Sequence, residues 1–96
     1  MDSEIKSIWT YEALNNLEEI LEYLRNRWGK WEIDRFKLKL FKNVEFIREH
    51  PLIFPVSTQL KGVRKAVLSS ELSLFYKVSE SAIYIVALFH NKRNLL

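Results

Sequence analysis

Two amphipathic helical segments with almost no linker between them constrain this chain more than any other feature of its sequence. Their apolar residues recur at alternating spacings of three and four, the period of a helix that buries one face. They are Leu14, Leu17, Leu21, Leu24 and Trp28 in the first segment, and Ile33, Phe36, Leu40, Phe41, Val44 and Ile47 in the second. Gly29 is a natural C-terminal residue for the first helix, and Pro51 ends the second. Helices joined by so short a link pack as an antiparallel hairpin.

The rest of the chain has the pattern of β-strands. A short strand is predicted over Ile5–Trp9, with Thr10 as the N-cap of the helix that follows it. After a connection over Pro51–Gly62, three β-branched and aromatic runs are separated by brief polar breaks that suit hairpins. These runs are Val63–Ser69, Leu72–Val78 and Ala82–Phe89. The sequence therefore predicts an α+β fold of order β-α-α-β-β-β. Its helical hairpin covers one face of a small, mostly antiparallel four-stranded sheet and leaves the other face open and partly basic.

Length and composition narrow the class of protein. The 96 residues predict one domain, residues 1–96, and a hydrophobic content of 48% suits a packed core. The chain has no cysteine, two separate histidines and only two glycines. We therefore expect no cofactor, no bound metal, no thiolate chemistry and no phosphate-cradling loop. The N-terminal residues lack an apolar signal segment, and no apolar run has the length of a membrane span, so we expect a cytoplasmic protein that does not enter the membrane.

Basic residues gather in the second part of the chain. Of 15 Lys and Arg residues, 11 lie from Arg35 onward, against four of the 12 acidic residues. The net charge of +3 is modest, but its distribution gives the C-terminal part a positive field. Polyanions and acidic proteins are therefore plausible partners.

The run from Trp9 to Leu24 resembles the opening of the RelE/ParE toxin superfamily, in which a strand leads into a helix reading approximately A-x-x-D/N-L-x-x-I-x-x-Y-L/I. Further similarities follow in the family's order over nearly the whole chain. They are Trp28-Gly29, Phe36 with Leu40, Ile47–Pro51, Val63-Arg64, Leu74–Val78, and Ile83–His90 followed by Lys92-Arg93. Each piece by itself is mostly core periodicity, whereas the ordered set is fairly specific to this superfamily.

The resemblance implies a toxin of a type II toxin–antitoxin pair, of the kind associated with plasmid stabilisation, neutralised by an antitoxin protein encoded by an adjacent gene. It leaves three functions open. A ParE-like toxin would bind and poison a macromolecular target, DNA gyrase, without self-contained catalysis. A RelE-like toxin would cleave mRNA on the ribosome. A degenerate, non-toxic relative would only bind its partner.

The choice between the first two functions depends on a few residues. Metal-free RNA cleavage needs a base, an acid and cations that stabilise the phosphorane, and the candidate catalytic residues are His90, Arg64 and Arg93. Ribosome-dependent relatives typically end with a Tyr or a His-Tyr pair, whereas here His90 is followed by Asn91 and no Tyr follows Tyr84. This departure favours the ParE-like function. His90 also has a structural alternative, in which it bonds a backbone carbonyl at the end of the last strand.

Contact with the target or the antitoxin is predicted for five cations: Arg64, Lys65, Lys77, Lys92 and Arg93. Two other groups of residues receive a structural interpretation. We interpret the basic residues of the second helix as its solvated face; they are Arg35, Lys37, Lys39 and Lys42. We interpret the aromatic residues of the hairpin as core filling and not as base-stacking surfaces; they are Trp28, Trp31, Phe36 and Phe41.

Overall fold

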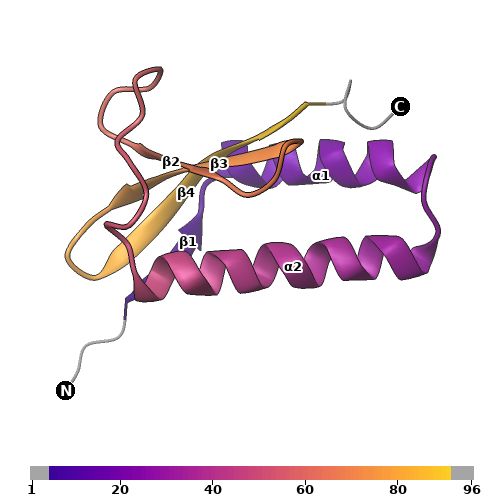
Figure 1. The fold of residues 1–96 in the computed structure, drawn as a ribbon, viewed down its shortest axis with the longest axis horizontal. Helices are drawn as coiled ribbons and strands as arrows, with labels where there is room; N and C mark the ends of the chain where they lie inside the picture. The colour runs from indigo at the N-terminus through magenta and orange to yellow at the C-terminus, as the bar shows by residue number, and fades with distance from the viewer. Residues whose placement is uncertain (1–4, 92–96) are drawn as a thin grey trace.

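The chain forms six elements in the predicted order, seen in a computed structural model that describes residues 5–91 (Figure 1). They are β1 (Lys6–Trp9), α1 (Tyr11–Arg25), α2 (Lys30–Glu49), β2 (Arg64–Val67), β3 (Leu72–Val78) and β4 (Ala82–His90). The strands lie in the order β1-β4-β3-β2. Strands β2, β3 and β4 form the predicted antiparallel meander, and β1 pairs parallel with β4. The two helices run side by side in opposite directions, which confirms the helical hairpin.

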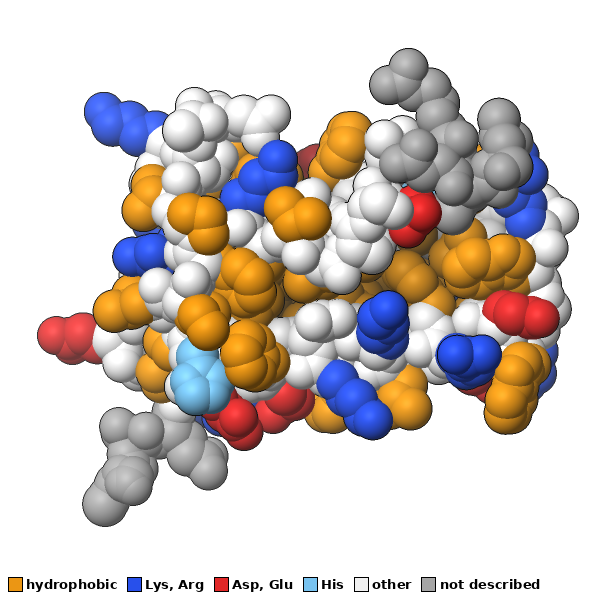
Figure 2. Space-filling model, in the orientation of Figure 1, with side chains coloured by type: hydrophobic (Ala, Val, Ile, Leu, Met, Phe, Trp, Pro, Cys, Tyr) orange, Lys and Arg blue, Asp and Glu red, His pale blue; other side chains and the backbone are white. Residues whose placement is uncertain are grey.

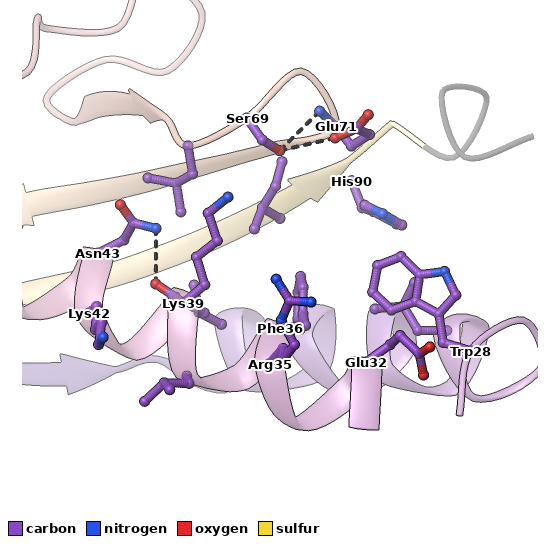
Figure 3. A pocket seen from close by; sticks show the side chains of 15 residues that line it. Trp28, Glu32, Arg35, Phe36, Lys39, Lys42, Asn43, Ser69, Glu71 and His90 are labelled. Atoms are coloured by element: carbon purple, nitrogen blue, oxygen red, sulfur yellow. Dashed lines mark hydrogen bonds between the residues drawn. The ribbon is translucent and has the colours of Figure 1, made fainter. Parts of the chain in front are cut away.

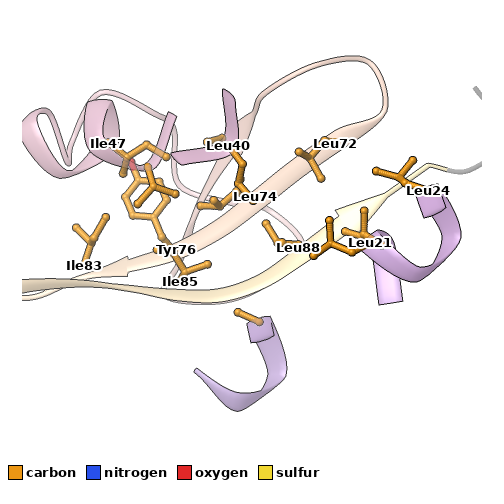
Figure 4. Packing of buried hydrophobic residues seen from close by; sticks show 14 of the residues in the cluster. Leu21, Leu24, Leu40, Ile47, Leu72, Leu74, Tyr76, Ile83, Ile85 and Leu88 are labelled. Atoms are coloured by element: carbon orange, nitrogen blue, oxygen red, sulfur yellow. The ribbon is translucent and has the colours of Figure 1, made fainter. Parts of the chain in front are cut away.

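One hydrophobic core lies between the helical hairpin and one face of the sheet (Figure 4). The helices supply Ala13, Ile20, Leu21, Leu24, Ile33, Leu40, Val44 and Ile47, and the sheet supplies Ala66, Leu72, Leu74, Tyr76, Ile83, Ile85 and Leu88. A register shift in the β3–β4 pair passes over Val86, because Tyr76 pairs with Ile85 and Phe75 pairs with Ala87. This extra residue brings both Ile85 and Leu88 to the helix-facing side, although they are three positions apart.

Side chains of Thr10, the N-cap of α1, and of Asn16 within α1 form hydrogen bonds with backbone groups of β4. Strand β1 pairs only with Ala82–Ile85, so the edge of β4 beyond Ile85 needs other partners. The Thr10 hydroxyl donates to the carbonyls of Ile85 and Val86 at 3.0 and 3.2 Å, and it accepts from the Ala13 N–H as the predicted N-cap. The side-chain oxygen of Asn16 accepts from the Leu88 N–H at 3.0 Å.

Substitution of Asn16 by Ala is expected to destabilise the fold by about 1–3 kcal/mol, because the half-buried N–H of Leu88 loses its acceptor. Asn15→Ala is the matched control, since Asn15 is exposed on the same helix. Urea unfolding of both variants measures the difference. Equal stability of the two variants would show that water replaces the Asn16 oxygen without cost.

The ends and faces of the helices differ in places from the sequence prediction. Helix α1 ends at Arg25, and Gly29 is the N-cap of α2, where its N–H donates to the Glu32 carboxylate at 3.0 Å. The prediction that Gly29 terminates the first helix was therefore wrong. Leu14 and Phe41 are 46% and 60% exposed, so their assignment to the buried stripes was also wrong. A spacing of three and four fits two neighbouring stripes of a helix. Tertiary packing buries Ala13 in place of Leu14, and it buries Leu40 as predicted but not its neighbour Phe41.

Within the part of the chain that the structure describes, neither helix combines the length and the hydropathy that a membrane crossing requires.

Candidate functional site

A groove lies between α2 and the part of the sheet around the β2–β3 turn, with a volume of about 470 Å³. Figure 2 shows this hollow on one face of the molecule, with hydrophobic side chains at its bottom. Its apolar lining comes from three elements and two turns and consists of Leu24, Trp28, Phe36, Leu38, Leu40, Leu68 and Leu72. Phe36 and Trp28 also pack against the core, so their interpretation as core filling is confirmed, whereas Trp31 and Phe41 are exposed and theirs was wrong.

Cations of α2 follow one side of the groove. Arg35, Lys39 and Lys42 recur at spacings of four and three, which places them on one side of the helix, next to the groove. In Figure 3 the Lys39 side chain extends from α2 toward the sheet. These residues were interpreted from the sequence as a solvated face. They are indeed exposed, but they also line the groove, and the signal was their helical spacing beside Phe36.

The opposite side of the groove carries Glu71 and, at its end, His90 (Figure 3). The pKa of Glu71 is lowered, with hydrogen bonding by Ser70 as the largest cause. Partial desolvation acts in the opposite direction, and hydrogen bonding by Ser69 and the electrostatic effect of nearby His90 lower the pKa further. The His90 ring meets the Tyr23 ring edge-on at 5.7 Å between centroids. The groove therefore offers an apolar floor, three cations and the Glu32 carboxylate along α2, and the Glu71 carboxylate on the opposite side.

Arg64 holds the connection that precedes β2. Its guanidinium donates to the Phe54 carbonyl at 2.7 Å, and the hydroxyl of its strand partner Tyr76 donates to the Pro51 carbonyl at 2.7 Å. Burial raises the pKa of Tyr76, although the charge of Arg64 acts in the opposite direction. Arg64 therefore lies on the helix-facing side of the sheet, where it fastens residues 51–54, and its predicted contact with a partner remains a prediction.

The two described candidates for catalysis lie far apart. Arg64 pairs with Tyr76 and His90 pairs with Leu72, so their partners are four positions apart on β3. At about 3.3 Å per residue this is roughly 13 Å along the strand alone. The third candidate, Arg93, and the predicted contact residue Lys92 lie outside the described residues.

Lys65 and Lys77 lie on the other side of the sheet, which we call the open face; its side chains include Lys65, Val67, Ser73, Phe75, Lys77, Tyr84, Ala87 and Phe89. The Lys65 ammonium lies 5.7 Å from the centre of the Phe75 ring and donates to the Gln59 side chain at 3.2 Å. Lys77 is exposed and pairs with Tyr84. Strand alternation thus separates Lys65 and Lys77 from Arg64, although all three were predicted as one contact set.

The open face is less bare than the sequence suggested. Val67 and Phe89 are 61% and 60% exposed, but Phe75 is only 8% exposed and does not belong to the helix-side core. The connection before β2 runs along the free edge of β2 and forms backbone hydrogen bonds with it. The Lys65 N–H donates to the Pro55 carbonyl, and the Ser57 N–H donates to the Val63 carbonyl. Hence the exposed apolar area of the face lies toward Val67 and Phe89.

Among residues 5–91, no three His, Asp or Glu side chains lie close enough together to hold a metal ion.

Comparisons with known proteins establish the family and the fold of this chain. A model of the family described as "ParE toxin of type II toxin-antitoxin system, parDE" matches residues 7–95. The chain therefore belongs to the ParE toxin family, within the RelE/ParE superfamily, and is a toxin of the type II toxin–antitoxin class. A search of curated proteins finds no match.

Solved structures share the fold at low sequence identity. The chromosomal ParDE system of P. aeruginosa matches with a TM-score of 0.77 and 18% identity, over 91% of this chain and 96% of that one. The E. coli DinJ-YafQ toxin–antitoxin complex matches with a TM-score of 0.62 and 13% identity, over 94% and 96%. The YoeB/ParE toxin of Agrobacterium tumefaciens matches with a TM-score of 0.60 and 14% identity, over 90% and 98%. These similarities support the β-α-α-β-β-β fold.

Proposed function

We propose that this ParE-family toxin acts by binding and poisoning DNA gyrase, and that it does not cleave RNA with its own residues. The separation of Arg64 from His90 carries the proposal. A nuclease needs its base, its acid and its phosphate-binding cations within reach of one scissile phosphate. The backbone positions of Arg64 and His90 are roughly 13 Å apart along the strand, and β3 lies between their two strands. One phosphate group would therefore contact both residues only if both side chains extended toward it. Arg64 is, moreover, engaged with the Phe54 carbonyl.

The open face is the surface we assign to the target. It combines Lys65 and Lys77 with the exposed rings of Phe89 and Tyr84. Aromatic residues in a patch with few carboxylates are typical of protein interfaces, and lysines steer the encounter with an acidic surface. Lys92 and Arg93 follow β4 directly in the sequence and extend the same proposed contact.

The groove is the surface we assign to the antitoxin. Its apolar floor accepts the apolar side of an amphipathic helix, and Arg35, Lys39 and Lys42 favour carboxylates along the edge of that helix. An antitoxin partner agrees with the toxin family of this chain and with relatives solved as toxin–antitoxin complexes. Because the groove and the open face lie on opposite sides of the sheet, we propose separate surfaces for antitoxin and target.

The purified toxin is expected to inhibit supercoiling by gyrase in vitro and to leave mRNA intact in a cell-free translation reaction. His90→Ala should retain this inhibition, whereas Lys65→Glu combined with Lys77→Glu should reduce it by about tenfold or more, as expected for contacts at a target interface. Circular dichroism confirms that each variant is folded. Cleaved mRNA with unaffected gyrase, abolished by His90→Ala, would instead establish the RelE-like function. Normal growth of cells during induced expression would point to a non-toxic binding protein.

A further inference from the structure

The outward side of α2 carries large apolar side chains that the core does not use. Trp31, Leu38 and Phe41 are 71%, 54% and 60% exposed. Their spacings of seven and three residues place them in one stripe along the helix. Three large exposed side chains in one line mark a contact surface, because burying each of them would be favourable. We call this row the α2 stripe.

Charges along the α2 stripe are arranged symmetrically about its middle residue. Asp34 lies four positions before Leu38, and Lys42 lies four positions after it. Both are exposed. The Asp34 carboxylate accepts from Lys30 at 3.1 Å, but its side chain remains 54% exposed and can accept a second cation. The fourth position from Leu38 is therefore an anion in one direction and a cation in the other, with the exposed Arg35 beside Asp34 on the side of the groove.

We propose that two copies of this chain pair through their α2 stripes, with the helices antiparallel and Leu38 on the twofold axis. Asp34 of each copy then lies opposite Lys42 of the other, and the two Leu38 side chains meet at the centre. Trp31 covers the part of the other helix near Glu45. A parallel pair would instead set Asp34 beside Asp34 and Lys42 beside Lys42, which is repulsive.

The charge pattern favours a second copy over an unrelated helix. A twofold axis makes each contact occur twice, so one Asp34–Lys42 pairing supplies two ion pairs. Helix α2 has 20 residues, which corresponds to a length of about 30 Å, and the stripe runs from its first turn to just past its middle. The contact does not involve the proposed target surface, because Lys65 and Lys77 lie on the far side of the sheet. It does overlap the edge of the groove, since Leu38 and Lys42 both line it, so dimer and antitoxin would compete for these two residues.

Analytical ultracentrifugation of the full chain, without antitoxin or gyrase, tests the proposal. The wild-type protein is expected to sediment increasingly as a dimer as its concentration rises. Leu38→Glu should keep it monomeric, because two carboxylates would meet at the axis, and Lys37→Glu, an exposed change off the stripe, should retain the dimer. A wild-type protein that stays monomeric up to high concentration, or a Leu38→Glu variant that still dimerises, would overturn the proposal.

A charge swap tests the antiparallel arrangement itself. Asp34→Lys and Lys42→Asp, each alone, should weaken the dimer by about tenfold, because attraction turns into repulsion at two symmetric places. The double variant Asp34→Lys/Lys42→Asp should restore the dimer, since the pairs are then reversed. A double variant as weak as the single variants, with unchanged helical content by circular dichroism, would contradict this arrangement. A negative gyrase assay would leave the result unaffected, so the two proposals fail separately.

Discussion

Charge reversal in the groove, Arg35→Glu with Lys39→Glu, is expected to weaken antitoxin binding by about 100-fold or more. Both residues line the groove beside its apolar floor, so a docked helix would bury them partly from water. In that environment a reversed charge meets the antitoxin's carboxylates at close range and in a low dielectric. Isothermal titration calorimetry with the antitoxin from the adjacent gene measures the change in Kd.

The control is a second double reversal away from the groove, Lys37→Glu with Lys61→Glu, which changes the net charge by the same amount. Both residues are exposed, and neither lines the groove. This variant should bind the antitoxin within about threefold of wild type, because distant exposed charges are screened by salt. Equal losses in the two double variants would mean that the antitoxin responds to the overall field and does not occupy the groove.

The elements of the fold could be predicted from the sequence because each has its own periodicity. The helical hairpin follows from spacings of three and four on both sides of Gly29, and the meander follows from three β-branched runs with short polar breaks. The parallel pairing of β1 with β4 was not specified by the sequence pattern. Residues 6–9 pair with residues 82–85, and no local signal indicates which distant strand a short segment will join.

The candidate site was harder to predict, because its parts come together only in the folded chain. Residues near position 35–43 of α2 meet residues 68–72 and His90 across the groove. The spacing of residues along the sequence does not predict that these three segments line one groove. The position of Arg64 shows the same limit. Alternation separates Arg64 from Lys65, but only the path of residues 51–54 determines that Arg64 bonds to a carbonyl of the connection.

Two leucines of α1 test whether burial, and not helical spacing, determines stability. Leu24 is fully buried in the core, and Leu14 is 46% exposed, although the sequence pattern places both in one stripe. Leu24→Ala is expected to reduce the free energy of unfolding by about 2–5 kcal/mol, because it removes buried contacts and leaves a cavity. Leu14→Ala should cost less than about 1 kcal/mol, since little apolar surface is returned to water.

The comparison is sensitive because a domain of this size has a total stability of only about 5–15 kcal/mol. Loss of the Leu24 side chain would thus remove a large share of it and reduce the amount of folded toxin in cells, which would weaken growth arrest without any change at the target surface. Urea unfolding of wild type, Leu24→Ala and Leu14→Ala, followed by tryptophan fluorescence, gives the two differences. Similar losses of unfolding free energy in both variants would mean that Leu14 is buried in solution. The hydrophobic core would then extend further toward the N-terminal end of α1.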